Sequence, residues 1–171
     1  MALKKPVTPE AAKIRMADLC ARSEQCEYDI RQKLYRMGIF ADDASEIMDY
    51  LTDNKFIDNA RFARSYARDK CRFSAWGPYK IRQGLAAKRV SQSDIATAIG
   101  SLEEDDLLSA VRRVAKAKGK SLDLHGEDRR EQRMKLYRHI LSRGFDSRMA
   151  SMAVKEVIAN SRPKGDEEVA E

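Results

Sequence analysis

The sequence has few of the residues that form tight turns and few that build catalytic centres. It holds only 8 glycines and 4 prolines in 171 residues, so the turn signals that strands need are scarce. The two histidines, His125 and His139, are not part of a serine-hydrolase order with a nucleophile elbow. We therefore expect an all-α protein that is not an enzyme and has no catalytic residue, metal site or cofactor.

Cysteines and long apolar runs are also scarce. The three cysteines, Cys20, Cys26 and Cys71, are odd in number and lack the Cys-x-x-Cys spacing of disulfide frameworks and zinc sites. Free thiols in a reducing cytoplasm are the better interpretation. The segment from Met1 to Pro9 has no apolar stretch of the kind found in signal peptides, and no run reaches membrane length. We expect a cytoplasmic protein that does not enter a membrane.

Positive charge is plentiful and unevenly placed. Lysine and arginine total 33 against 27 aspartates and glutamates, which gives a net charge of +6. Residues 160–171 contain two basic and four acidic side chains. We therefore expect a disordered acidic tail over residues 161–171 and a more basic body before it. A basic body indicates an anionic partner, and nucleic acid is the usual one.

Apolar residues recur three or four positions apart along most of the chain, which predicts helices. Thr8-Pro9 is a start signal, Ile14 and Leu19 mark the first apolar stripe, and Ser23 is predicted to cap the next helix. That helix is expected to end at Gly38. Further starts are expected at residues 41–43, 58, 91 and 147. The segment Ser101-Leu-Glu-Glu104 resembles a capping box, and its acidic continuation to Asp106 favours a helix start over a metal site.

Three segments align without gaps, at Tyr28–Ile39, Tyr79–Val90 and Met134–Phe145. The first two share Tyr-x-Ile-Arg-Gln-x-Leu, and each segment is followed by another short helix pattern. We predict three tandem three-helix repeats, at 8–57, 58–100 and 101–160. Stacked repeats would form an elongated, curved rod suited to an extended partner, and such a rod can act as a monomer.

The helix expected from Asp58 to Phe73 carries the clearest functional signal. Its arginines are spaced to lie on one face: Arg61, Arg64, Arg68 and Arg72. Phe62, Tyr66 and Phe73 fall on another face, which is expected to pack into the core. Guanidinium groups bind phosphate or carboxylate through paired hydrogen bonds. The arginine face is therefore either a solvated helix face or a binding surface for DNA phosphates or an acidic protein.

Two later stretches extend the basic character of the chain. One contains Arg112, Arg113 and Lys116, and the other runs from Arg129 to Arg143. Trp76 and Tyr79 lie beside the arginine-rich segment, where they either stack on bases or pack at the junction between repeats.

Two segments stand out as longer motifs. They are Asn54-Lys-Phe-Ile-Asp-Asn-Ala-Arg-Phe-Ala-Arg-Ser-Tyr66 and Trp76-Gly-Pro-Tyr-Lys-Ile-Arg-Gln-Gly-Leu85. Both resemble motifs of the RecX family of RecA regulators. The resemblance covers residues 17–99, and the third repeat fits mainly by architecture. Two positions depart from the family pattern: Asn59 stands where the family often has a second aspartate, and Phe56 replaces the usual glycine.

The resemblance implies tandem three-helix repeats and a partner. It implies binding in the groove of the RecA filament, which would limit ATP hydrolysis, strand exchange and coprotease activity in DNA repair and the SOS response. Contacts with single-stranded and double-stranded DNA, without sequence specificity, are also expected. The candidate contacts are Arg61, Arg64, Arg68, Arg72, Lys80, Arg82, Arg112, Arg113 and Lys116, whereas Asp58 and Phe62 are expected to be a helix cap and a core residue.

Two other functions stay open. Residues 84–102 read as a helix-turn-helix, which favours a direct DNA-binding regulator with Gln92 and Ser93 near the start of its recognition helix. A purely structural adaptor built from repeats is the other alternative, and the arginine face argues against it.

Overall fold

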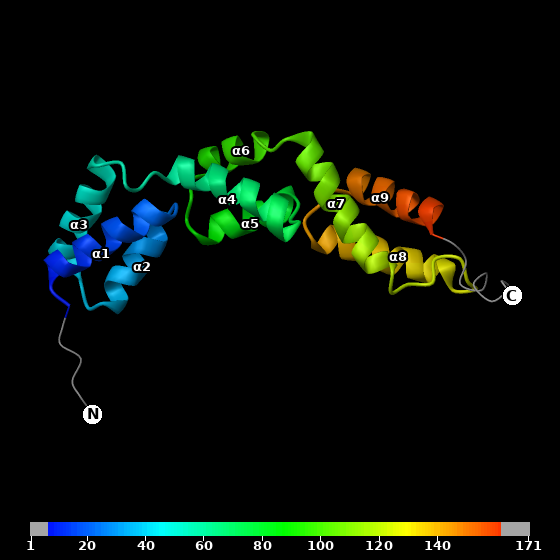
Figure 1. Ribbon diagram of the computed structural model, residues 1–171, viewed down its shortest axis with the longest axis horizontal. Helices are drawn as coiled ribbons and strands as arrows, with labels where there is room; N and C mark the ends of the chain where they lie inside the picture. Colours follow the sequence, from blue (N-terminus) through cyan, green and yellow to red (C-terminus); the bar gives the residue numbers. More distant parts are fainter. Residues whose placement is uncertain (1–6, 162–171) are drawn as a thin grey trace, which may run out of the picture. The chain divides into compact units, whose positions relative to one another are not determined.

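The computed structural model describes residues 7–161, and these residues form nine helices and no strand (Figure 1). The predicted all-α helical repeat fold is confirmed. The helices are α1 (Pro9–Arg22), α2 (Glu27–Arg36), α3 (Ala41–Asp53), α4 (Asn59–Ser74), α5 (Pro78–Ala87), α6 (Gln92–Gly100), α7 (Glu104–Gly119), α8 (Arg129–Ser142) and α9 (Ser147–Asn160). Apart from Ser161, the predicted acidic tail lies outside the described residues.

Several helix ends follow the local signals in the sequence. The Thr8 hydroxyl accepts a hydrogen bond from the Ala11 N–H at 3.3 Å, so Thr8 caps α1 as predicted. The Asp58 carboxylate accepts from the Arg61 N–H at 2.9 Å and caps α4. Gly38 follows α2 with a φ of +79°, a left-handed conformation in which glycine is favoured. Short-range hydrogen bonds decide these ends, which is why the sequence predicts them.

Two predicted caps are wrong. Ser23 ends α1, and the residue that precedes α2 is Cys26, whose side chain makes no capping hydrogen bond. The Glu27 N–H at the start of α2 instead donates to the Asn59 side-chain oxygen, 32 residues away, at 3.1 Å. The predicted capping box at Ser101 does not form, because α7 begins at Glu104 after Glu103, and Glu103 makes no side-chain cap bond.

The chain divides into two compact units, and the first comprises residues 1–66 and 85–98. Within this unit α3 packs against both α1 and α2 (Figure 1). Their shared core is built from nine buried side chains: Ala12, Met16, Ile30, Leu34, Ile39, Ile47, Met48, Leu51 and Ile57. Ile14 is not one of them, because it is 54% exposed. Ala12 and Met16 face the core, and Ile14 lies about 200° from each of them around the helix.

The second unit comprises residues 67–84 and 99–171, of which the structure describes those up to 161. Its helices α7, α8 and α9 pack against one another (Figure 1). The predicted core position of Phe73 is wrong, since this side chain is 82% exposed. The buried residues at this end of α4 are Ala67 and Cys71, and Phe73 lies about 200° from Cys71 on the helix. Phe62, in the first unit, is buried as predicted.

Two loops of the second unit meet backbone to backbone. The Gly77 N–H donates to the Arg143 carbonyl at 2.8 Å, and the Tyr79 N–H donates to the Gly144 carbonyl at 3.0 Å. A Cβ atom on Gly77 would lie 2.4 Å from the Gly144 carbonyl group, so only glycine allows this approach. The contact joins the loop before α5 to the loop before α9.

The three cysteines are free thiols, as predicted, with Cys26 and Cys71 buried. Burial raises the pKa of each thiol above its ordinary value. The boundaries of the three predicted repeats, 8–57, 58–100 and 101–160, stay a prediction.

Candidate functional site

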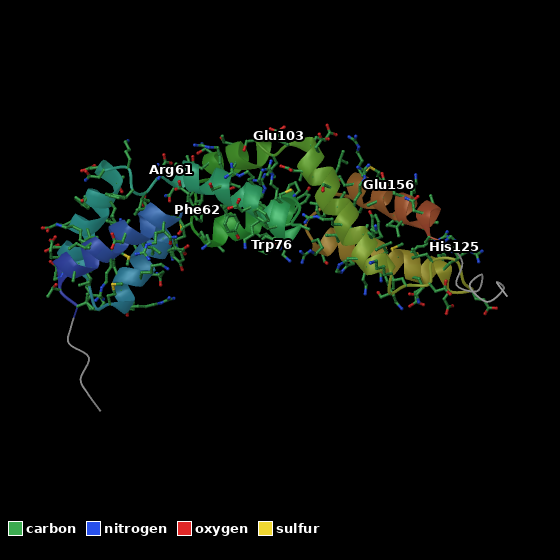
Figure 2. The ribbon with its side chains drawn as sticks, viewed as in Figure 1. Arg61, Phe62, Trp76, Glu103, His125 and Glu156 are labelled. Carbon is green, nitrogen blue, oxygen red and sulfur yellow. The ribbon has the colours of Figure 1, made fainter. Side chains whose placement is uncertain are left out.

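The arginines of α4 do not all face solvent freely. Arg61 is half-buried in the first unit, and its Nε donates to the Glu24 Oε1 at 2.6 Å (Figure 2). A second nitrogen of the same guanidinium donates to the carbonyls of Lys55 and Phe56, at 3.1 and 3.4 Å. The hydrogen bond that Arg61 donates to Glu24 raises the pKa of Arg61. Arg61 therefore links the turn before α4 to Glu24, which lies just before α2.

Arg72 lies at the other end of α4 and is also paired. Its Nε donates to the Asp106 carboxylate at 2.7 Å, and this bond raises the pKa of Arg72. Asp106 belongs to the first turn of α7, where a carboxylate also interacts favourably with the helix dipole. The ion pair joins α4 to α7 within the second unit.

Arg113 and Arg143 hold the C-terminal end of α4. The Arg113 guanidinium donates to the carbonyls of Cys71 and Arg72, and the Arg143 guanidinium donates to the Ser74 carbonyl. The last carbonyls of a helix have no partner within the helix, and a cation there also complements the negative end of the dipole. Arg113, predicted as a contact residue, is thus placed against backbone.

Arg112 makes a bidentate ion pair within the second unit. Two of its nitrogens donate to the two carboxylate oxygens of Glu156 on α9, at 2.8 and 2.9 Å. Figure 2 labels Glu156. The bond from Arg112 lowers the pKa of Glu156. Lys116, one turn further along α7, is exposed and lines a groove of about 500 Å³ between α7 and α9.

The remaining candidates keep their cations more accessible. Arg64 and Arg82 are exposed and form no ion pair with any other residue in the range 7–161. Arg68 lies 3.8 Å from the Asp69 carboxylate, and both side chains are more than half exposed. Lys80 lies over the ring of Trp76, with its Nζ 4.9 Å from the ring centroid, and Lys70 lies at the same distance. Because both ammonium groups lie over the Trp76 ring, they favour a packing role for this side chain over stacking on a base.

The candidate residues therefore separate into two groups. Arg61, Arg72, Arg112 and Arg113 are held by carboxylates or carbonyls 5 to 44 residues away in sequence. The partners Glu24, Asp106 and Glu156 were missed by sequence reasoning, because nothing local links them to these arginines. A chemical centre is not apparent either: within residues 7–161 there is no group of three or more His, Cys, Asp or Glu side chains placed to hold a metal ion.

A family model described as "RecX, second three-helix domain" matches residues 58–99. The regulatory protein RecX of Prosthecochloris aestuarii is 33% identical over 137 residues, which cover 80% of this chain and 87% of that protein. The chain belongs to the RecX family. The regulatory protein RecX of Clostridium botulinum is 29% identical over 137 residues, and here the chain spans 64% of the relative's length.

Solved RecX structures agree with this assignment. A crystal structure of regulatory protein RecX, 26% identical, superimposes with a TM-score of 0.73 and covers 86% of this chain and 71% of its own. RecX from Lactobacillus salivarius, at 19% identity, shares the fold with a TM-score of 0.72, covering 87% of this chain and 96% of its own. Among the described helices of this RecX-family chain, none has the length and apolar character to cross a membrane.

Proposed function

We propose that this chain is a non-enzymatic modulator of RecA filaments on DNA and that it inhibits them by binding in the filament groove. Membership of the RecX family carries the proposal, because the resemblance implies RecA as the partner. The expected result is slower ATP hydrolysis, strand exchange and coprotease activity in DNA repair and the SOS response. We further propose that the chain acts as a monomer in the cytoplasm.

The distribution of internal ion pairs refines the proposed contacts. We assign direct contact with the filament to Arg64, Lys80, Arg82 and Lys116, for which no ion pair is found within residues 7–161. We add Arg68, whose side chain is more than half exposed beside Asp69. Arg61, Arg72, Arg112 and Arg113 act through the fold, since each already donates to a partner within its unit. A groove that exposes both DNA phosphates and acidic side chains suits cations of the first group.

The test is the DNA-dependent ATPase of RecA, titrated with the full chain. A contact variant combines Arg64→Ala, Arg82→Ala and Lys116→Ala. A control variant combines Arg15→Ala, Arg31→Ala and Arg148→Ala, which removes the same charge from exposed arginines outside the candidate set. We expect inhibition by the native chain, at least 10-fold weaker inhibition by the contact variant, and near-native inhibition by the control, because phosphate contacts act locally.

Equal weakening by both variants would show that total charge, and not the assigned contacts, governs inhibition. No inhibition by the native chain, together with tight binding to one duplex sequence in a mobility shift, would instead favour the helix-turn-helix regulator. In that case Gln92 and Ser93, which are exposed at the start of α6, become the residues to change.

A further inference from the structure

A groove between α8 and α9 combines apolar walls with a basic rim. It measures about 620 Å³, within the usual range of ligand sites, and all the residues that line it belong to the second unit. From α8 it is lined by Arg129, Arg130, Arg133, Met134 and Tyr137, and from α9 by Lys155. Glu127 is the one acidic residue among the described residues that line it. The groove therefore presents a strong excess of positive charge.

The apolar part of the groove arises because α8 carries two apolar stripes. Leu136 and Ile140 are fully buried and form the stripe that faces the core. Met134, Tyr137 and Leu141 form a second stripe at the i, i+3, i+7 spacing, and Met134 and Leu141 are 45% and 37% exposed. A second stripe of this kind leaves part of the apolar surface of the helix exposed to solvent. Tyr137, half-buried within it, offers an aromatic ring at the groove.

The cations of the rim are not used by the fold. Arg129, Arg130 and Lys155 are exposed, and none of them forms an ion pair with another residue between positions 7 and 161. Arg133 differs, because its Nε donates to the Leu124 carbonyl at 3.0 Å, which fixes the side chain in the wall. Three uncommitted cations beside an apolar floor contrast with Arg61, Arg72 and Arg112, which are already paired with carboxylates.

We propose that the groove between α8 and α9 binds a segment of single-stranded nucleic acid, with an unstacked base against Tyr137 and Met134 and phosphates on Arg129, Arg130 and Lys155. The inference deepens the proposed function, on which it rests for DNA as a partner. It adds a site in the second unit that lies outside the contacts assigned above.

The combination of walls and rim selects a single strand over the alternatives. In a duplex the base faces are stacked on one another, so the apolar floor would have nothing to contact. An acidic peptide would pair with the three cations and has no need of an aromatic ring. A single strand offers both phosphates and free aromatic faces, and stacking on aromatic side chains is how proteins bind such strands without sequence preference.

The test measures binding of the full chain to a short fluorescent oligothymidylate and to a hairpin duplex with the same number of phosphates. The groove variant combines Arg129→Ala, Arg130→Ala and Lys155→Ala. We expect it to bind the oligothymidylate about 10-fold or more weakly, and its slope of log affinity against log salt to be shallower by about 2, because about 0.7 counterions are released per single-strand phosphate. The control variant Arg15→Ala, Arg31→Ala, Arg148→Ala should stay within about 3-fold of the native chain.

Tyr137→Leu keeps an apolar side chain in the wall and removes the ring. We expect it to weaken oligothymidylate binding about 5-fold or more while duplex binding stays unchanged, because only an unstacked base uses the ring. If thermal unfolding shows that Tyr137→Leu is unstable, Met134→Glu places a negative charge on an exposed position of the same wall and should also weaken oligothymidylate binding.

Three results would overturn the proposal. The first is equal loss of affinity in the groove and control variants, which would mean diffuse electrostatic attraction. The second is native affinity of both wall variants for the oligothymidylate. The third is displacement of the oligothymidylate by a poly-glutamate peptide whose own affinity equals that of the oligothymidylate, which would make the groove an acidic-peptide site.

These measurements contain no RecA, so the two proposals can fail separately. A chain whose groove binds oligothymidylate as expected but which leaves RecA ATPase unchanged would retain the groove and lose the filament function. If the chain inhibits RecA ATPase but its groove variants bind oligothymidylate normally, the filament function stands and the groove proposal fails.

Discussion

Asp58 and Asn59 are neighbours at the start of α4, and their side chains accept backbone hydrogen bonds from different helices. Asp58 accepts from the Arg61 N–H of its own helix, whereas Asn59 accepts from the Glu27 N–H of α2. Asn59 is one of the two positions that depart from the family pattern. An amide oxygen meets the same need as a carboxylate oxygen here, so the departure is compatible with the fold.

The cap by Asp58 should depend on pH. The hydrogen bond from the Arg61 N–H lowers the pKa of Asp58 below its ordinary value of 3.8, with burial acting in the opposite direction. A lowered pKa in the folded state means that the contribution to stability is present above the ordinary pKa and is lost as the pH falls through the folded pKa. In urea unfolding, we expect Asp58→Ala to cost about 1 kcal/mol at pH 6 and progressively less as the pH falls below the ordinary pKa of 3.8.

Asp58→Asn supplies the matched control. Its amide oxygen accepts the same bond and does not titrate, so the difference in unfolding free energy between Asp58→Asn and Asp58→Ala should not change with pH. If the difference in unfolding free energy between the native chain and Asp58→Ala does not fall between pH 6 and pH 2, the carboxylate charge is irrelevant to the cap.

At the scale of elements, the second unit is joined by loops as well as by helix faces. The approach of Gly77 to Gly144 leaves no room for a side chain, and Arg143 adds a bond from its guanidinium to the Ser74 carbonyl. The Arg113 guanidinium likewise donates to the Cys71 carbonyl near the end of α4. Backbone polar groups at loop ends are thereby satisfied without buried charged side chains.

The loop junction gives a prediction about stability. Gly77→Ala should lower the free energy of unfolding by about 1–3 kcal/mol, because the new Cβ overlaps the Gly144 backbone. Gly100→Ala is the control: apart from its chain neighbours and its own helix backbone, no atom lies within 4 Å of its Cβ position, so the change should stay within about 1 kcal/mol and favour the folded state. Chemical denaturation of both variants measures this, and equal stability of the two would contradict the close approach.

At the scale of the whole molecule, the boundaries between the two compact units fall inside helices. They lie after Tyr66 in α4, after Gly84 in α5 and after Ala98 in α6. A helix that is half unfolded loses hydrogen bonds at the break, and helix formation is cooperative. The two units are therefore expected to depend on each other for stability, as neighbouring parts of repeat proteins do.

This dependence predicts a single unfolding transition. Trp76 is the only tryptophan of the chain and lies in the second unit, so its fluorescence reports on that unit. Far-UV circular dichroism reports on all the helices together. We expect the two signals to give the same midpoint and the same slope in urea. A tryptophan transition clearly separated from the dichroism transition would mean that the units unfold independently.

The all-α fold and several helix ends follow from sequence patterns alone, because they depend on contacts within one or two turns. The family follows from the motifs of residues 54–85. Thr8, Gly38, Asp58 and Ser147 mark helix ends in both the pattern and the structure. Apolar periodicity also placed Phe62 in the core correctly, and Leu19 and Tyr66 are half-buried. Ile14 and Phe73 are exposed, because smaller residues form the face of each helix that packs into the core. Residue type alone does not determine which face of a helix is buried.

The arginines that are already paired with carboxylates can be identified only from the three-dimensional arrangement of the chain. Arg61, Arg72 and Arg112 pair with carboxylates 34 to 44 residues away, and the groove between α8 and α9 collects its basic rim from two helices. Charge is visible in a sequence, but its pairing depends on which segments the chain path brings within a few ångströms. At that distance a hydrogen-bonded carboxylate occupies an arginine that the sequence alone would leave open to DNA.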